Sequence, residues 1–345
     1  MHFRSIHFKA LTAKKILFSA VLLILLCLAY TTLKDPLQRY LFGVKRDVCF
    51  MNIPLAGKLE PEVEFFVRQA AKIYYFYPSS AVFIPETKEV IPELNACYID
   101  VQKTVVKIMQ APPGSNIKPV YVETRPLLTL NDYPASPIYQ GHPAKKQIAL
   151  MFSVSCSSTD KYIEDLLDVL ARENIRATFF LTGKWAEENP EYVNLIFNHG
   201  HELGNHGYQE DIAITGLKGA EMQGDIVKTN ALLFRLAGVK AVNFTPNHGE
   251  YNDLLLEAVS RLGMRTVLWS VNTADWQTAE LKKIADTVRE SLGNGKIIRI
   301  QPTEQPAAFL AELIAILQDE GYELTSVEEL LSPSPFSSEG RLIVE

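Results

Sequence analysis

The sequence has few cysteines and no excess of positive charge. Only four of its 345 residues are cysteine, and no two of them form a CxxC pair, which argues against a zinc site built from cysteines. Lysine and arginine number 34 against 40 aspartate and glutamate, so the formal net charge is −6. No basic stripe is available to neutralise phosphates, and the sequence therefore does not predict nucleic-acid binding.

Long hydrophobic runs are also lacking, with one exception. Residues 16–33 are apolar and uncharged, and Lys14 and Lys15 precede them. This length is near the ~20 residues that cross a bilayer as a helix. We expect an uncleaved signal anchor in a single-pass cell membrane protein. The basic tail 1–15 then lies in the cytoplasm and everything after about residue 34 lies outside it.

Three alternatives to the anchor are a cleaved signal peptide, a lipoprotein processed at Cys27, and a buried core helix. No small-x-small cleavage site follows the apolar run. Leu26 stands where a lipoprotein has a small residue. The terminal position and the basic flank argue against a core helix. Farther along, Cys49 and Cys97 fall in the first extracytoplasmic region. A disulfide between them is an alternative there, but we expect two unpaired thiols, because spacing alone does not establish connectivity.

The rest of the chain has the length of about two folded domains. Residues 36–130 mix helical and strand-like patterns and predict a small α+β domain. Residues 131–145 are rich in proline and glycine, which is typical of a linker or an extended lead-in strand. From 146 to about 332, buried strand-like runs such as 148–152 (IALMF) alternate with helical patterns, and a tail follows at 333–345. This alternation predicts a parallel sheet, open or closed into a barrel, with reactive groups at the carboxyl ends of the strands.

Five segments of this region carry a family resemblance. They are 177–183 (ATFFLTG), 200–206 (GHELGNH), 249–252 (GEYN), 268–276 (LWSVNTADW) and 321–324 (GYEL). In this order they resemble the polysaccharide deacetylase family, also called the NodB homology domain or carbohydrate esterase family 4. The resemblance implies a distorted (β/α) barrel with fewer than eight regular strands. The lead-in 137–141 (PIYQG) resembles a membrane-anchored branch from spore-forming Gram-positive bacteria.

The family hydrolyses the acetamide of N-acetylated sugars in peptidoglycan, chitin or related polymers. A divalent metal, usually zinc, polarises the amide carbonyl and lowers the pKa of a bound water. In the family an aspartate and two histidines hold the metal, a second aspartate is the general base, and a histidine protonates the departing amine. An arginine and another aspartate orient the base.

The first two family motifs are degenerate in this chain. Where the family has its aspartate pair, Ser153 replaces the base and Val154 replaces the metal-binding aspartate. A valine has no lone pair to give a metal, and a serine hydroxyl is a poor base near pH 7. Of the two motif histidines, His206 is present and Glu210 stands in the second place. His206 and Glu210 are therefore the remaining metal candidates, with the third ligand lost.

The later motifs are also incomplete. Thr245 replaces the arginine of the third motif, and Gln301 replaces the histidine that acts as general acid. Asp275 is retained in the fourth motif. No catalytic residue set is therefore intact. The residues that we expect to contact a sugar are Phe244, His248, Asp275 and Trp276.

Three interpretations remain. We favour a catalytically inactive deacetylase domain of the cell envelope that binds peptidoglycan or a related N-acetylated glycan. The second is a working metal-dependent hydrolase with an altered site built from His206, Glu210, Asp211, His248 and Asp275. The third is a structural partner in a membrane or sporulation complex. We expect no cofactor under the first interpretation, and zinc or another divalent metal under the second.

Overall fold

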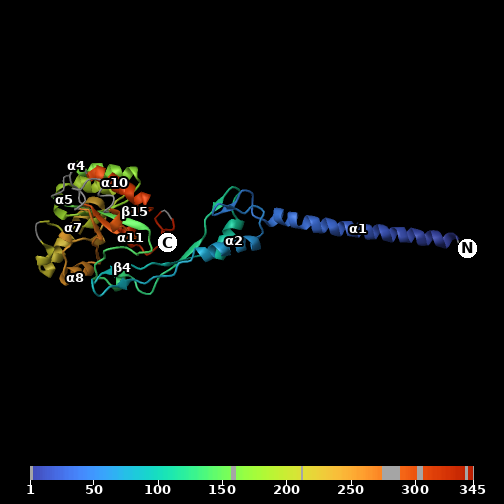
Figure 1. Ribbon diagram of the computed structural model, residues 1–345, viewed down its shortest axis with the longest axis horizontal. Helices are drawn as coiled ribbons and strands as arrows, with labels where there is room; N and C mark the ends of the chain where they lie inside the picture. The colour runs from blue at the N-terminus through green and yellow to red at the C-terminus, as the bar shows by residue number, and fades with distance from the viewer. Residues whose placement is uncertain are drawn as a thin grey trace. The chain divides into compact units, whose positions relative to one another are not determined.

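The computed structural model describes residues 3–156, 161–210, 213–273, 288–300, 306–338 and 341–344. The chain divides into two compact units (Figure 1). The first unit comprises Met1–Phe76 and Cys97–Val122, and the second comprises Tyr77–Ala96 and Glu123–Glu345. The predicted α+β range 36–130 is thus shared between the units, because residues 77–96 and 123–130 belong to the second.

The first unit begins with a long helix, α1 (Phe3–Phe42). Within it, Val21–Phe42 is long and apolar enough to cross a membrane, judged by length and composition. This segment overlaps the predicted span 16–33 and extends past it. A helix of this kind near the N-terminus fits a membrane anchor or a signal sequence.

Helices and short strands follow α1 in the first unit. Their bounds are β1 (Cys49–Phe50), β2 (Ile53–Pro54), α2 (Glu60–Ile73), β5 (Ala96–Ile99), α3 (Val101–Met109), β6 (Asn116–Ile117) and β7 (Tyr121–Thr124). Helix α2 buries Val63 and Val67, one turn apart, against the same apolar cluster that receives Val105 and Ile108 of α3. This spacing places apolar side chains on one helix face, so the two helices share a small core. All four cysteines lie in the described residues, and none of them forms a disulfide.

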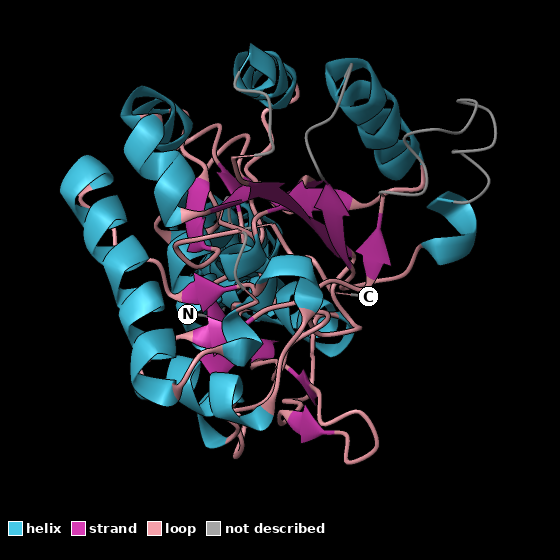
Figure 2. Cartoon of the chain, turned by 90° about the vertical axis from the view of Figure 1, so that its left-hand side faces the viewer, coloured by secondary structure: helices cyan, strands magenta, loops and turns pink. Residues whose placement is uncertain are grey.

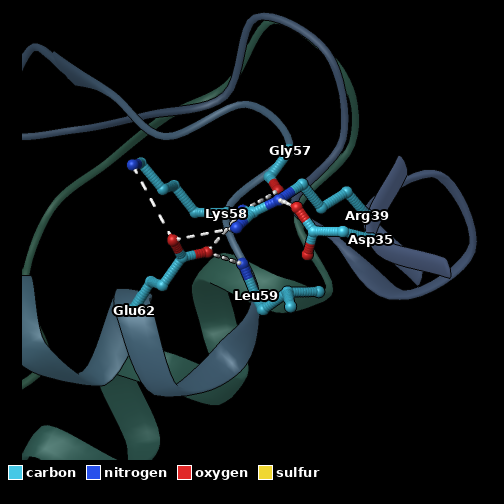
Figure 3. Close-up of polar contacts among 6 residues, drawn as sticks. All are labelled: Asp35, Arg39, Gly57, Lys58, Leu59 and Glu62. Carbon is cyan, nitrogen blue, oxygen red and sulfur yellow. Dashed lines mark hydrogen bonds and ion pairs between the residues drawn. The ribbon is translucent and has the colours of Figure 1, made fainter. Parts of the chain in front are cut away.

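Polar contacts join the end of α1 to the start of α2 (Figure 3). The Arg39 guanidinium donates to both carboxylate oxygens of Glu62, at 2.7 and 3.3 Å, and to the Gly57 carbonyl at 3.2 Å. The same carboxylate accepts the Leu59 backbone N–H at 2.8 Å, which satisfies one donor at the start of α2. The Arg39 hydrogen bond and the Leu59 N–H lower the pKa of Glu62 to about 2. These hydrogen bonds connect the C-terminal end of α1 to α2 within the first unit.

The second unit is built on a curled parallel sheet. Among the described residues the sheet has eight strands, in the order β12-β11-β10-β9-β8-β14-β13, with β15 beside the start of β8. Their bounds are β8 (Gln147–Val154), β9 (Thr178–Leu181), β10 (Glu202–Asn205), β11 (Asn243–Phe244), β12 (Arg265–Thr266), β13 (Val271–Asn272), β14 (Ile297–Ile300) and β15 (Glu323–Thr325). The family resemblance implied a distorted barrel with fewer than eight regular strands, and the irregular strands of this sheet agree with that. Three of the strands, β11, β12 and β13, have only two residues each.

Helices cover the outer face of the sheet (Figure 2). The longer ones are α4 (Lys161–Arg172), α6 (Pro190–Asn198), α7 (Gly219–Ala237), α8 (Asp253–Arg261) and α10 (Pro306–Asp319), and the short ones are α5 (Gly183–Glu188) and α11 (Val327–Leu331). Short 3-10 turns lie at η1 (Leu130–Asp132), η2 (Ile214–Gly216) and η3 (Asn247–Gly249). Helix α7 ends at Ala237 and is capped by Gly238, whose φ of 71° is the left-handed conformation that glycine adopts without strain. Alternating strands and helices thus form the predicted α/β architecture.

The lead-in to β8 belongs to the second unit as well. Ile138 bridges to Val267, next to β12, and Gln140 bridges to Lys296, next to β14. In the strand order, β12 and β14 lie on either side of β8, so the lead-in contacts both sides of the sheet. Residues 77–96 contribute the small hairpin β3 (Val82–Phe83) and β4 (Val90–Ile91). Val90 donates to the Pro137 carbonyl, which ties this hairpin to the lead-in.

Candidate functional site at the strand ends

Strand alternation decides which side chains point into the curled sheet. On β8, Leu150 and Phe152 belong to the apolar layer that includes the surrounding helices. Met151 belongs to a separate apolar cluster inside the sheet. Because side chains alternate along a strand, Ser153 continues the inner row of Met151, and Val154 continues the outer row.

The outward position of Val154 has a direct chemical consequence. Its side chain is fully buried in the same apolar layer as Phe152 and Leu181. The residue at the metal-ligand position therefore packs as a core side chain and has no donor atom to offer. Ser153 lies inward and is 5% exposed. Its hydroxyl accepts a hydrogen bond from Nε of Arg299, at 3.1 Å.

His206 follows β10 and is buried in the inner group. Its Nδ1 lies 2.8 Å from the Thr245 carbonyl oxygen, which can only accept, so Nδ1 carries the proton in this arrangement. Burial lowers the pKa of His206 to about 4, and this outweighs the Thr245 hydrogen bond, which favours the charged form. The charges of Arg299 and Glu210 also act on the ring, in opposite directions. His206 is therefore neutral near pH 7.

Glu210 and His248 lie in the loops that follow β10 and β11. Ser155 Oγ donates to Glu210 Oε1 at 2.8 Å, so the carboxylate is engaged by a neighbour of the first motif. His248 is exposed and has a φ of 57° inside η3. Both side chains act electrostatically on His206. A shared groove lined by His206, Glu210 and His248 stays a prediction.

Phe244 is one of the residues that we expected to contact a sugar. Phe244 is fully buried in the outer apolar layer, which corrects its prediction as a sugar-contacting residue. The physical reason is strand alternation: Phe244 points outward, so its neighbour Thr245 points inward. Thr245 is also fully buried, and its hydroxyl has no hydrogen-bond partner among the described residues. Asp211, Asp275, Trp276 and Gln301 lie outside the described residues.

Arg299 is the site residue that motif comparison did not single out. It lies on β14 between Ile298 and Ile300, which face the outer apolar layer, so its side chain points inward. Its guanidinium lies over the Trp269 ring, 4.3 Å from the centroid. The side chain is 7% exposed, and this burial lowers its pKa. The signal in the sequence was a lone charge in an apolar strand, two residues before Gln301.

The described residues do not fit a divalent metal. No three His, Cys, Asp or Glu side chains among them are grouped to hold an ion. A catalytic zinc site has three protein ligands. Here Val154 packs outward, Ser155 holds Glu210, and the guanidinium of Arg299 adds a fixed positive charge near His206. A metal-dependent step therefore cannot be derived from this arrangement.

Comparison with known proteins relates this chain to polysaccharide deacetylases. Residues 140–267 match the family model for polysaccharide deacetylase. The uncharacterized protein YlxY of Bacillus subtilis is 28% identical over 319 residues, which is 92% of this chain and 97% of YlxY. The peptidoglycan-N-acetylglucosamine deacetylase PgdA of Listeria monocytogenes is 28% identical over 229 residues, 65% of this chain and 48% of PgdA.

A solved structure extends the likeness beyond the matched domain. BA3943 of Bacillus anthracis, a CE4 family pseudoenzyme, is 27% identical with a TM-score of 0.68, and the match covers 79% of this chain and 95% of that one. A BA3943 mutant with restored enzymatic activity matches with the same TM-score and 26% identity. The curled parallel sheet of the second unit is thus the fold of carbohydrate esterase family 4.

Proposed function

Because the second unit is a domain of the polysaccharide deacetylase family, we propose that this protein is an inactive member that binds N-acetylated glycan of the peptidoglycan type. One observation carries the proposal. At the base position the Ser153 hydroxyl accepts a hydrogen bond from the Arg299 guanidinium, where the family places an anionic carboxylate. The group that should take a proton from water is replaced by a neutral hydroxyl beside a fixed cation.

The chemistry of amide hydrolysis supports inactivity. A positioned base and a positioned acid each contribute about 10²–10⁴-fold to such a reaction. Ser153 cannot take a proton from water near pH 7, and the carboxamide of Gln301 is not acidic enough to transfer a proton to the amine. His206 is neutral, but its Nδ1 proton is held by the Thr245 carbonyl. Binding a sugar needs shape and hydrogen bonds rather than these groups, so glycan recognition is compatible with their loss.

The test of inactivity uses the full chain purified in detergent. We expect no stoichiometric zinc by elemental analysis. We also expect no acetate release from peptidoglycan or N-acetylated oligosaccharides with added zinc, cobalt or manganese. An active peptidoglycan deacetylase assayed in parallel shows that the substrates are competent. Stoichiometric metal together with metal-dependent acetate release would refute the inactive assignment and favour the altered-site hydrolase.

The test of glycan binding is independent of activity. We expect the chain to co-sediment with purified peptidoglycan and to do so less after the polymer is chemically de-N-acetylated, because the acetamide is the group that the fold recognises in active relatives. Equal co-sedimentation with both polymers, or none with either, would favour the structural-partner interpretation.

We also propose that α1 anchors the protein in the cell membrane with both units outside the cytoplasm. The support is the apolar helix segment Val21–Phe42 and the preceding Lys14 and Lys15, since positive charge is retained on the cytoplasmic side. Protease added to intact spheroplasts should digest the second unit. Protection of the second unit until the membrane is lysed would show the opposite orientation.

A further inference from the structure

A cavity of about 750 Å³ lies at the end of the curled sheet opposite the candidate site. Its walls include Arg176, two residues before β9, and His201, directly before β10. Because β9 and β10 are parallel, their first residues lie at one edge of the sheet, and His206 follows the other end of β10. A cavity of this volume is of the size that holds a small organic ligand.

His201 places a buried hydrogen-bond donor in the wall of this cavity. The residue is 4% exposed, and its Nδ1 accepts the Ala177 backbone N–H at 3.2 Å. In a neutral imidazole the proton is then on Nε2. This Nε2 is buried and has no hydrogen-bond partner among the residues that the structure describes. Because a buried donor without an acceptor is costly, this wall is suited to receive an acceptor from a ligand.

A second group without a partner lies in an adjoining cavity of about 310 Å³. Thr325 of β15 lines that cavity, and its hydroxyl is buried without a hydrogen-bond partner in the described part of the chain. Arg176 lines both cavities. Its guanidinium lies beside Gly200, since a β-carbon added there would be 3.7 Å from Nε, and its charge acts on the His201 ring. A cation therefore lies where the two cavities meet, close to the Nε2–H of His201.

The acidic side chains of the larger cavity differ in how they are engaged. Glu202 accepts a hydrogen bond from the Asn243 side-chain amide at 2.6 Å, and Glu329 accepts the Ser338 backbone N–H at 2.7 Å. Glu328 of α11 also lines the cavity and is exposed, and within the described ranges its carboxylate has no hydrogen bond or ion pair. An acidic wall disfavours a dianionic phosphate. It favours a ligand that has an amino group as well as an acid group.

Apolar side chains complete the lining. Phe197, Val242 and Phe336 contribute to the walls, and Phe197 and Val242 are partly open to solvent. They offer a surface against which an apolar side chain of a ligand can be removed from water. A ligand with a carboxylate, an amino group and an apolar side chain is a short peptide.

We propose that this cavity binds a short peptide by its carboxyl end, with the carboxylate at Arg176 and His201 and the amino group toward Glu328. The planar fork of a guanidinium matches a carboxylate in two parallel hydrogen bonds, which a lysine cannot reproduce. The carboxylate also accepts the buried Nε2–H of His201. The cavity and the candidate glycan site lie at opposite ends of the sheet, so the two proposals are independent.

Calorimetric titration of the full chain in detergent with three dipeptide probes tests the cavity. Ala-Leu carries both charges and an apolar side chain, its amide lacks the carboxylate, and its N-acetyl derivative lacks the amino group. We expect Ala-Leu to bind at least about tenfold more tightly than the amide, since hydrogen bonds to charged groups are worth about 10–100-fold in affinity. The N-acetyl derivative should lose less affinity, because Glu328 is exposed. The preference for the acid should shrink at high salt, because Arg176 is exposed as well.

Variants locate the effect. Arg176→Leu should remove the preference for the acid and leave the affinity for the amide unchanged, and Arg176→Lys should keep a smaller preference because it retains the charge without the fork. His201→Phe should weaken the binding of Ala-Leu, because it removes the Nε2–H and keeps an aromatic ring. Arg172→Leu is the matched control: it removes an exposed arginine of α4 whose Nε donates to the Asp168 carbonyl, and it should change nothing. A thermal melt establishes that each variant is folded.

Each contrary outcome removes a different part of the proposal. Equal binding of Ala-Leu and its amide by the natural chain overturns the carboxylate site, even if no variant folds. A preference that survives Arg176→Leu overturns the role of that residue. Absence of binding by all three probes overturns the peptide site and makes the cavity a place for water only. The glycan proposal keeps its own test, because these probes contain no sugar.

Discussion

Lys145 offers a quantitative test of the second unit. Its side chain is fully buried just before β8. The ammonium donates to the backbone carbonyls of Leu330 at 3.1 Å, Glu329 at 3.5 Å and Ser332, at the end of α11. Burial lowers the pKa of Lys145 to about 8, although the charges of Glu329, Glu123 and Glu93 oppose the change. The buried lysine thus holds its proton less tightly than a lysine in the unfolded chain, whose pKa is about 10.4.

The sign of the pH effect follows from this difference. Between pH 8 and about 10.4 the unfolded chain binds a proton at Lys145 that the folded chain has released, so the free energy of unfolding rises with pH. Since one pKa unit corresponds to about 1.36 kcal/mol, the rise is roughly 3 kcal/mol across that window. Below pH 8 the lysine is charged in both states, and this gain is absent.

The assay is denaturant unfolding of the chain in detergent, followed by tryptophan fluorescence. The sequence has three tryptophans, Trp185, Trp269 and Trp276, all within the second unit, so the signal reports on that unit. The measured quantity is the difference in unfolding free energy between the natural chain and Lys145→Met at each pH. It should rise by roughly 3 kcal/mol from pH 8 to 10.4. Lys240→Met, which removes an exposed lysine, is the control and should give a flat difference. A flat or falling difference for Lys145→Met would refute the reasoning.

Three further predictions concern other parts of the chain. Burial lowers the pKa of His201 to about 4, so between pH 6.5 and 4 the unfolded chain binds a proton that the folded chain does not. Lowering the pH from 6.5 to 4 should therefore reduce the free energy of unfolding by roughly 3 kcal/mol. His201→Gln should remove that loss in the same unfolding assay. Glu62→Ala should speed amide hydrogen exchange at Leu59 at the α1–α2 junction, whereas Glu64→Ala, which breaks only an ion pair within α2, should not. Restoring the family pattern should recover zinc by elemental analysis, because it returns the aspartate and histidine ligands that the natural chain lacks. Absence of zinc from a folded restored chain would contradict this. The restoring set is Ser153→Asp, Val154→Asp, Glu210→His, Thr245→Arg and Gln301→His.

Much of the candidate site could be predicted from the motifs. The order of the five segments was enough to indicate the family and the α/β fold, since segments such as 200–206 carry both the strand and the residue that follows it. The rule that parallel strands present their carboxyl ends at one edge predicts that His206, Glu210 and His248 lie in one groove. The contact role of Phe244 was wrong, because a linear motif does not state which face of a strand each residue takes.

The sequence by itself determined which ligand, base and acid positions of the family are replaced. It also determined that an apolar helix lies near the N-terminus. Only the tertiary structure decided which side chains lie next to the replaced residues. Ser153 and Arg299 are 146 residues apart in the chain, and pairing of β8 with β14 brings them to 3.1 Å. Likewise, residues 77–96 join the second unit because Val90 and Asn95 bond to Pro137 and Pro333. Both results depend on strand pairing between distant segments, which local pattern and composition do not encode.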